Sequence, residues 1–327
     1  MRALSRLAAR LAYIGPDGFL LATRMKFSLA KIGRMKTAIA SSIAGALVFL
    51  IILTSSPHVA FAQEIVTFAT LDDQAQGSGA TVLRAVLFKP DGAGPFPAVV
   101  AMHGCSGLFN RSGKLMSREH AWAETLTARG YVVLFPDSFT PRQIGSACAD
   151  NGPGARPWVE RTDDAYGALQ YLQSLSFVIA NRVALIGWSH GGGSVIFAID
   201  PATKARPASL SKGDFAAAVA FYPGWCKAKA LGSQWTTAIP FLLEMGAADD
   251  WTPAAPCVDV VQAAIARGAP ARMQVYAGAY HDFDWPGMAV HVSTPSRGKT
   301  VHTGIDPEAR ADAFSRVPAF LDEYLKP

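Results

Sequence analysis

The chain has 327 residues, half of them hydrophobic, and its 30 basic and 25 acidic residues give a formal net charge of +5. This length and apolar content argue against a disordered or fibrous protein, because they suffice for a large buried core. Eight of the basic residues and one acidic residue lie within the first 62 positions, so the remainder carries a slight negative charge of −2. A nucleic-acid-binding role, which needs a basic surface on the folded domain, loses its main support.

The first 62 residues have the pattern of a leader that directs export. A basic segment at 25–36 precedes an apolar stretch at 37–54 without charged residues, and Ala60-Phe61-Ala62 follows. A basic segment, an apolar core and small residues at A-x-A spacing are typical of a secretory signal peptide, so we expect cleavage near 62/63. An uncleaved membrane anchor is the alternative, because the apolar core is long. Three methionines are candidate translation starts: Met1, Met25 and Met35.

The region 63–327 is expected to form one domain, since it contains no repeat, low-complexity tract or linker. Its predicted strands are 63–69, 81–88, 97–102, 131–136, 182–186, 215–222, 240–245 and 271–276. Its predicted helices are 117–129, 159–175, an apolar stretch at 195–199, 256–267 and 307–325. Apolar strands that alternate with helices predict an α/β fold with a doubly wound, mostly parallel sheet flanked by helices. Ligands bind such sheets at the carboxyl ends of the strands.

The segment Gly187-Trp188-Ser189-His190-Gly191 joins a predicted strand to the apolar stretch at 195–199. Its G-x-S-x-G spacing is that of a nucleophile elbow, in which a serine occupies a sharp strand-to-helix turn. The flanking positions must be small there, because neighbouring backbone approaches closely. A glycine-rich turn without a catalytic role can have the same sequence, so this segment alone leaves both interpretations open.

A serine nucleophile needs a base to take its proton and a carboxylate to orient that base. Asp249 and His281 each follow a later predicted strand, which gives the order Ser, Asp, His that is typical of α/β-hydrolases. Asp250 is the alternative acid, because it adjoins Asp249. His291 and His302 are alternative bases, since both lie in a long loop after the last predicted strand.

Two backbone N–H groups are candidates for binding the oxyanion of a tetrahedral intermediate. His190, the residue after the serine, supplies one of them in this arrangement. Cys105 follows the strand 97–102 and is predicted to supply the other, because Gly104 and Gly107 allow this loop to approach the serine. An ordinary turn after the strand is the alternative interpretation.

Five motifs together resemble the dienelactone hydrolase family of the α/β-hydrolase superfamily. They are His103-Gly104-Cys105-Ser106-Gly107-Leu108, Asp137-Ser138-Phe139-Thr140-Pro141-Arg142, Gly187-Trp188-Ser189-His190-Gly191-Gly192, Gly246-Ala247-Ala248-Asp249-Asp250-Trp251-Thr252-Pro253 and Tyr280-His281-Asp282-Phe283. The resemblance covers nearly all of 80–325 and implies a hydrolase of esters or lactones with a Ser/Cys–Asp–His triad and no metal or organic cofactor. The enzymes that give the family its name use a cysteine nucleophile in the cytoplasm, whereas a serine follows an export signal here.

Four residues near the predicted catalytic loops are candidate substrate contacts. Arg142 is a candidate for binding an anionic group, with a solvated loop arginine as the alternative. Trp188, Trp225 and Trp251 are candidates for lining an apolar pocket, although packing in the core is the alternative for each.

Four cysteines follow the leader, and export permits disulfides between them. Cys105 and Cys148 follow two consecutive predicted strands, and Cys226 and Cys257 follow another consecutive pair. Loops after consecutive strands are often neighbours, so we predict the disulfides Cys105–Cys148 and Cys226–Cys257. No C-x-x-C pair occurs, so we expect no structural zinc site.

The sequence therefore predicts an exported hydrolase, periplasmic or secreted, that cleaves a small-molecule carboxylic ester or lactone through an acyl-enzyme on Ser189. We expect no nucleic-acid partner, and contact with a membrane only through an uncleaved leader. A peptidase of the same fold is one alternative function. A non-catalytic binding protein that has kept the fold is the other, because a fold does not define a function.

Overall fold

The computed structural model describes residues 62–72, 80–149, 154–296 and 299–326. The predicted leader, with its candidate start positions and the alternative anchor, lies outside these residues except for Ala62, where the first strand begins. Within the described ranges, no helix has the length and apolar character needed to cross a membrane.

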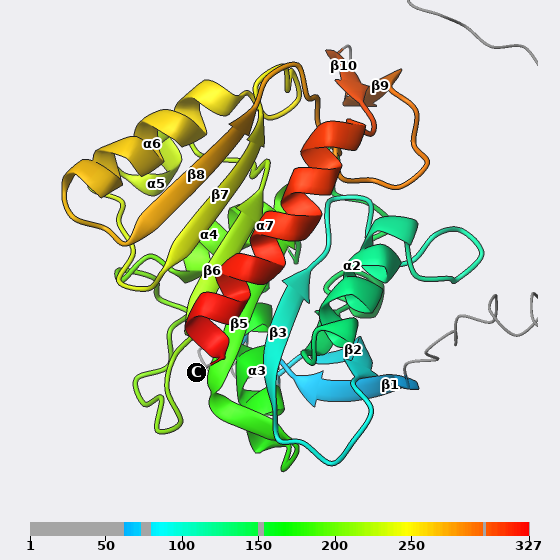
Figure 1. The fold of residues 1–327 in the computed structure, drawn as a ribbon, viewed down its shortest axis with the longest axis vertical. Coiled ribbons are helices and arrows are strands. Elements are labelled where there is room, and N and C mark those ends of the chain that lie inside the picture. The colour runs from blue at the N-terminus through cyan, green and yellow to red at the C-terminus, as the bar shows by residue number, and fades with distance from the viewer. Residues whose placement is uncertain (1–61, 73–79, 150–153, 297–298, 327) are drawn as a thin grey trace, which may run out of the picture. The chain divides into compact units, whose positions relative to one another are not determined.

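An eight-stranded sheet forms the centre of the described structure (Figure 1). Its strands are β1 (Ala62–Ala69), β2 (Val82–Lys89), β3 (Phe96–Met102), β4 (Val132–Pro136), β5 (Val178–Trp188), β6 (Ala217–Phe221), β7 (Phe241–Gly246) and β8 (Ala271–Tyr276). Their spatial order is β1-β2-β4-β3-β5-β6-β7-β8. Strand β2 is antiparallel to both neighbours, and every pair from β4 to β8 is parallel. The predicted doubly wound, mostly parallel sheet of an α/β-hydrolase is therefore confirmed.

Helices cover both faces of this sheet. In Figure 1, α2 (Ser117–Ala128) and α7 (Pro307–Leu325) lie on the near face, and α3 (Glu160–Ser174) and α4 (His190–Ala198) lie on the far face. Helix α6 (Ala254–Ala266) packs against β7 and β8. The central strands β4 and β6 are buried at every position, as expected for strands enclosed on both faces. Two short helices, η1 (Thr140–Arg142) and α5 (Ala228–Leu231), are the remaining helices of the described residues.

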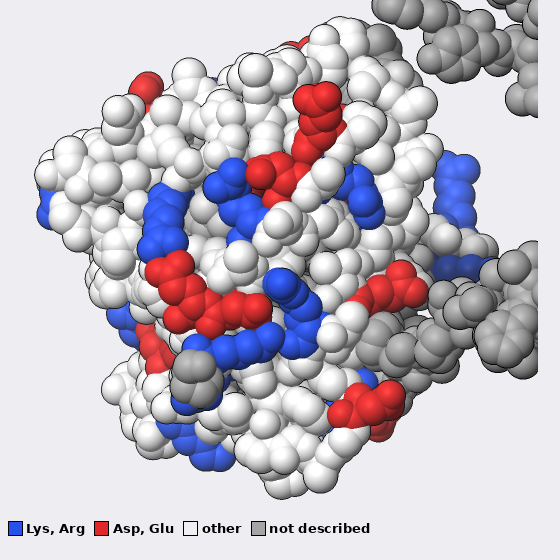
Figure 2. Space-filling view, viewed as in Figure 1, with Lys and Arg blue, Asp and Glu red and all other residues white. Residues whose placement is uncertain are grey.

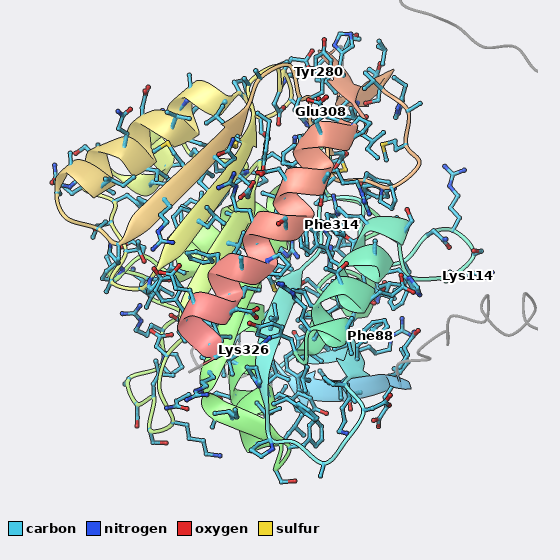
Figure 3. All side chains as sticks on the ribbon, in the orientation of Figure 1. Phe88, Lys114, Tyr280, Glu308, Phe314 and Lys326 are labelled. Atoms are coloured by element: carbon cyan, nitrogen blue, oxygen red, sulfur yellow. A yellow bond between two sulfur atoms is a disulfide. The ribbon has the colours of Figure 1, made fainter. Side chains whose placement is uncertain are left out.

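The two helices of the near face are joined by aromatic packing. Phe314 of α7 lies on the side of this helix that faces α2 (Figure 3). Its ring stacks on that of Trp122 in α2, with 4.0 Å between the ring centroids. The Arg310 guanidinium lies 4.0 Å from the same Phe314 ring on its own helix. The outer side of this face carries acidic and basic side chains in an interspersed pattern (Figure 2). Helix α7 thus buries one side in the core and exposes a mixed charged side.

The larger differences from the sequence-based prediction concern four elements, β5, α4, β9 and β10. Strands β9 (His291–Ser296) and β10 (Lys299–Thr303) pair as an antiparallel hairpin. A long loop was predicted there because the largely polar sequence lacks a strand pattern. Helix α4 begins at His190 instead of Val195, although three glycines in its first turn have low helix propensity. Strand β5 begins at Val178, four residues before the predicted start.

A fully buried carboxyl group lies between β7 and α7. Glu244 of β7 contacts the Tyr276 hydroxyl at 2.6 Å, and this hydroxyl lies 2.9 Å from a carboxylate oxygen of Asp312. The Tyr276 hydroxyl has one proton, so it can donate to only one of the two carboxyl groups at a time. Burial raises the pKa of Glu244 to about 8.

This arrangement predicts that Glu244 lowers the stability of the fold as the pH rises. Its pKa is near 4.5 when it is exposed and about 8 in the fold, so unfolding releases its proton between these values. Glu244→Gln keeps the group neutral and removes this dependence. Between pH 5 and pH 8, the free energy of unfolding of the variant should gain about 2 to 4 kcal/mol relative to the parent. Urea unfolding at both pH values measures this gain.

The matched control is Glu64→Gln, which changes an exposed glutamate on β1. Its difference from the parent should be the same at pH 5 and pH 8. A constant difference for Glu244→Gln as well would show that Glu244 is ionised in the fold.

Candidate active site

Ser189 lies in the turn between β5 and α4 with φ at 54° and ψ at −110°. A positive φ is a strained conformation for a residue with a side chain, and it persists only where the surrounding structure enforces it. The Ser189 N–H donates to the carbonyl of Phe221 at 2.9 Å, and its own carbonyl accepts from Gly193 at 2.9 Å and from Gly224 at 3.2 Å. The neighbouring strand β6 and helix α4 therefore hold the serine backbone in place.

The glycines of the G-x-S-x-G pattern are required by close backbone contacts. A Cβ atom on Gly187 would lie 2.4 Å from the carbonyl oxygen of Gly191. A Cβ atom on Gly191 would lie 2.0 Å from the carbonyl oxygen of Met102, in the neighbouring strand β3. Both distances are shorter than any van der Waals contact, so the turn can form only with glycine at these two positions.

The Ser189 side chain lines a cleft of about 370 Å³ at the carboxyl ends of the strands. We call it the Ser189 cleft. The predicted oxyanion residues Cys105 and His190 line the same cleft, and so do Trp225 and Trp251. Five of the residues selected from the sequence are thus neighbours in space, although they come from four separate loops.

Asp249 and His281 form a buried pair behind these loops. The Asp249 Oδ2 atom lies 2.7 Å from His281 Nδ1, and its Oδ1 atom accepts from the backbone N–H groups of Trp251 at 2.9 Å and Thr252 at 2.8 Å. The Thr252 hydroxyl lies 2.9 Å from Oδ2. A proton on Nδ1 that donates to the carboxylate leaves Nε2 of His281 as the basic nitrogen.

The surroundings of His281 raise its pKa above the ordinary value of 6.5. Burial by itself would lower the pKa, but the charge and hydrogen bond of Asp249 outweigh it. The rings of Tyr222 and Trp251 pack against the imidazole, with 4.5 Å and 4.8 Å between centroids. The imidazole is therefore a stronger base than a histidine in water.

The alternative acid and base form a second pair at the surface. Asp250 Oδ2 lies 2.8 Å from His302 Nδ1, and Asp250 Oδ1 accepts from the His302 backbone N–H at 2.8 Å. Both side chains are about 40% exposed, whereas those of Asp249 and His281 are at most 1% exposed. His291 is exposed on β9 and contacts the carbonyl of Ala289. Two adjacent aspartates thus pair with two different histidines. The Asp249–His281 pair is buried, and the Asp250–His302 pair is open to water.

The predicted oxyanion residues are anchored differently. His190 is the first residue of α4, where backbone N–H groups have no partner within the helix. Cys105 is bonded to Cys148, and its carbonyl accepts from the backbone of Ala147 at 2.8 Å and from the Ser146 hydroxyl at 3.3 Å. This disulfide and these hydrogen bonds fix the loop after β3 beside Ser189.

His103 has a structural role that the sequence did not indicate. Its Nδ1 donates to the carbonyl of Gly104 at 2.7 Å, and its Nε2 accepts from the backbone N–H of Ser138 at 3.3 Å. Burial lowers its pKa well below 6.5, so the ring is neutral. His103 therefore ties the loop after β3 to the loop after β4.

Two of the predicted substrate contacts do not reach the cleft. Arg142 forms ion pairs with Asp72 at 2.6 Å and Asp164 at 2.7 Å, and its side chain is 9% exposed. Trp188 is fully buried, and its indole N–H donates to Asp284 at 2.9 Å. Both predictions are therefore wrong, because carboxylates already occupy the guanidinium and the sheet core encloses the indole.

Trp225 and Trp251 do line the cleft, together with two lysines that no sequence motif indicated. Lys299 of β10 donates to the Trp251 carbonyl at 2.8 Å, so the hairpin braces this wall. Lys227 follows the second disulfide, Cys226–Cys257. The two predicted disulfides are thus both present. Cys105 and Cys148 line the cleft, and Cys226 lies between the lining residues Trp225 and Lys227.

No group of three or more His, Cys, Asp or Glu side chains within the described part of the chain has an arrangement that could hold a metal ion.

The fold and this cleft define an α/β-hydrolase. The family model of the dienelactone hydrolase family matches residues 83–325, so the chain belongs to this family and is a hydrolase that acts on esters. A protein from Klebsiella pneumoniae described as a dienelactone hydrolase is similar over 80% of this chain and 100% of its own, with 18% identity and a TM-score of 0.57.

Two further solved structures share the fold at similar distance. Thermogutta terrifontis esterase 2, solved as its paraoxon-phosphorylated form, has 18% identity and a TM-score of 0.56, over 81% of this chain and 96% of its own. Porphyromonas gingivalis dipeptidyl peptidase 4 has 19% identity and a TM-score of 0.56, over 81% of this chain but only 36% of its own. The identities are low, so these two comparisons concern the fold alone.

The strained turn predicts an unusual effect of glycine on stability. Ser189→Gly should relieve the positive φ, whereas Ser189→Ala keeps it and removes the same hydroxyl. We expect the Gly variant to be more stable than the Ala variant by about 1 kcal/mol, although glycine normally destabilises a fold. Thermal or urea unfolding of the two variants measures the difference. A more stable Ala variant would mean that the turn relaxes when the hydroxyl is removed.

Proposed function

We propose that this protein is an exported serine hydrolase that cleaves small-molecule carboxylic esters or lactones through an acyl-enzyme on Ser189. The observations that carry the proposal are the buried Asp249–His281 pair, 2.7 Å between Oδ2 and Nδ1, and a strained serine that opens into a cleft. Thr252, whose hydroxyl lies 3.1 Å from His281 Nδ1, lines the same cleft as Ser189. An acid, a base and a nucleophile on three loops at one edge of the sheet are the groups that ester hydrolysis by acyl transfer requires.

In the first half of the reaction, Ser189 Oγ bonds to the ester carbonyl carbon while its proton passes to His281 Nε2. Asp249 stabilises the imidazolium that forms. The N–H groups of Cys105 and His190 stabilise the negative charge on the carbonyl oxygen. The intermediate then collapses: the bond to the alcohol oxygen breaks, and this oxygen takes the proton from His281. The product is an acyl-enzyme, and the alcohol leaves.

In the second half, water replaces the alcohol. His281 takes a proton from the water as its oxygen bonds to the acyl carbon, and the same two N–H groups stabilise the second oxyanion. The bond to Ser189 Oγ breaks, and His281 returns the proton to this oxygen. The carboxylic acid leaves and the free enzyme is restored. With a lactone substrate, alcohol and acid are parts of one product molecule.

Export is supported by the predicted leader and by the position of the disulfides. Disulfides persist in compartments outside the cytoplasm. The Cys105–Cys148 bond anchors the loop of one proposed oxyanion donor, and the Cys226–Cys257 bond lies beside Trp225. A reducing compartment would therefore loosen both walls of the cleft.

The adjacent Asp–His pairs allow a matched test of the triad with 4-nitrophenyl esters of varied acyl length. Ser189→Ala and His281→Ala should each lower kcat by about 10⁴-fold or more, because each removes a member of the acyl-transfer machinery. His302→Ala should leave kcat within about twofold of the parent, since exposed side chains rarely contribute to a buried reaction centre. Loss of activity in His302→Ala but not in His281→Ala would transfer the role of base to the hairpin.

The pKa of His281 predicts the pH dependence of the reaction. The base must be neutral, so kcat/KM should fall as the pH drops through a midpoint above 6.5. Asp249→Asn should move this midpoint to lower pH, because it removes the charge that raises the pKa, and should lower kcat about 10⁴-fold. Asp250→Asn, the control, should leave the midpoint unchanged. Equal shifts in both variants would contradict the assignment of Asp249.

A further inference from the structure

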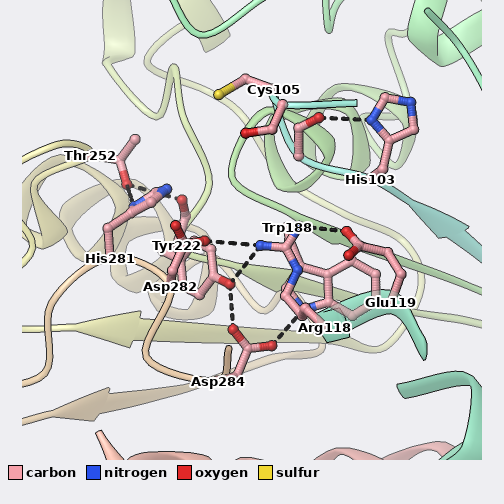
Figure 4. A network of polar contacts seen from close by, with 12 residues as sticks. His103, Cys105, Arg118, Glu119, Trp188, Tyr222, Thr252, His281, Asp282 and Asp284 are labelled. Atoms are coloured by element: carbon pink, nitrogen blue, oxygen red, sulfur yellow. Dashed lines mark hydrogen bonds and ion pairs between the residues drawn. The ribbon is translucent and has the colours of Figure 1, made fainter. Parts of the chain in front are cut away.

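A buried group of charged and polar side chains lies beside His281 (Figure 4). At its centre is Arg118 of α2, whose side chain is 3% exposed. Its Nη1 donates to Asp282 at 2.9 Å and to the Tyr222 hydroxyl at 3.3 Å, and its Nη2 donates to Glu119 at 2.5 Å. Both terminal nitrogens of the guanidinium therefore have partners, and the partners come from three different parts of the fold.

Two partners of Arg118, Asp282 and Tyr222, adjoin the proposed base His281. Asp282 is the residue after His281, and it has a positive φ of 61°. Tyr222 directly follows strand β6, and its ring packs against the His281 imidazole. Asp282 forms an ion pair with Arg118 of α2. This ion pair restrains the backbone at Asp282 and so the direction in which the preceding residue, His281, points.

Arg118 also contacts the segments of the other two groups. Its guanidinium carbon lies 5.4 Å from the ring centroid of Trp188, the residue before Ser189. A Cβ atom on Gly104, the residue before Cys105, would lie 3.1 Å from Arg118 Nη2. The Arg118 side chain thus contacts or adjoins three residues, Trp188, Asp282 and Gly104. Each of them is the direct neighbour in sequence of a proposed functional residue.

Asp284 forms further hydrogen bonds with the side chains around Arg118. Its carboxylate accepts from the indole N–H groups of Trp122 at 2.7 Å and Trp188 at 2.9 Å, and it also contacts the Tyr222 hydroxyl. Burial raises the pKa of both Asp284 and Glu119. Arg118 therefore shares a buried site with three carboxyl groups, those of Glu119, Asp282 and Asp284. Removing so many charged groups from water costs free energy, which only well-placed ion pairs and hydrogen bonds offset.

We propose that Arg118 is a positioning residue, which clamps the segment of His281 to the segments of Ser189 and Cys105 and so sets the place of the base. The proposal rests on the function proposed for these three residues. Arg118 does not line the cleft within the described part of the chain, so it acts through Asp282 and Tyr222 and not on the substrate.

The charges around His281 give this role a signature that a purely structural residue would lack. Besides the Trp251 ring and the Thr252 hydroxyl, four titratable side chains face the imidazole. They are Asp249 from the loop after β7, Asp282 from its own loop, Tyr222 from the loop after β6 and Arg118 from α2. Asp249 and Asp282 raise the pKa of His281, and Arg118 lowers it. Loss of the Arg118 charge should raise the pH midpoint of kcat/KM, and loss of the Asp282 charge should lower it.

The test compares three variants by ester hydrolysis across pH. Arg118→Lys keeps the charge but not the forked geometry, so kcat should fall about 10- to 100-fold while the pH midpoint stays near that of the parent. Arg118→Gln should lower kcat similarly and move the midpoint to higher pH. Asp282→Asn keeps the shape of the side chain at the edge of the network, and it should lower kcat and move the midpoint to lower pH. Asp282→Asn also provides the test if the Arg118 variants do not fold.

Arg142 offers a matched control, because it is another buried arginine held by two carboxylates, Asp72 and Asp164. Arg142→Lys and Arg142→Gln should reduce stability but leave kcat per folded molecule and the pH midpoint unchanged. Folded fractions are measured by circular dichroism under the assay conditions. Opposite midpoint shifts in Arg118→Gln and Asp282→Asn, together with unchanged Arg142 variants, would support the proposal.

Two failures are distinguishable. If the parent hydrolyses no ester and does not react with paraoxon, the proposed function fails. If the parent is active but the variants of Arg118 and Asp282 behave like those of Arg142, the proposed function stands and the positioning role of Arg118 is overturned. A parental kcat in Arg118→Lys would also overturn it, since the forked geometry would then have no effect.

Discussion

The candidate site depends on the close approach of three backbone segments at the turn between β5 and α4. A Cβ atom on Gly187 would meet the Gly191 carbonyl within the turn, and one on Gly191 would meet the Met102 carbonyl of strand β3. The chain can then reverse from strand to helix only with Ser189 at positive φ, which presents its side chain to the cleft. The strain is sustained by hydrogen bonds to β6 and α4 and by the packed sheet beneath.

Parallel strands bring the remaining groups to the same edge. Asp249 follows β7 and His281 follows β8, so the register of two neighbouring strands sets the 2.7 Å contact between them. Cys105 follows β3, which pairs with β5, the strand that leads to Ser189. The loops alone would be free to move, and three devices restrict them: two disulfides, the His103 hydrogen bonds and the buried contacts of Arg118. Rigid supports of this kind are what a preorganised site requires.

The sheet and the two cysteine pairs were predictable from the sequence, because apolar strand patterns and strand order determine them. The sequence favoured Asp249 and His281 but left Asp250, His291 and His302 open, because the burial that distinguishes the two Asp–His pairs arises only from tertiary packing. Arg142 and Trp188 were assigned to the substrate because proximity in sequence says nothing of the carboxylates that bind them, Asp164 and Asp284. The Arg118 network joins positions more than 100 residues apart, and no local pattern reveals it.

The central claim is that Ser189 is the nucleophile. Paraoxon should transfer a diethylphosphoryl group to it and release 4-nitrophenolate, because an activated serine hydroxyl attacks the phosphorus as it would an ester carbonyl carbon. Peptide mapping by mass spectrometry of the native protein after treatment should find the adduct on Ser189, with loss of esterase activity in proportion to labelling. Unfolded protein and the Ser189→Ala variant should remain unlabelled. An adduct on another residue, or full activity after stoichiometric labelling of Ser189, would contradict the account.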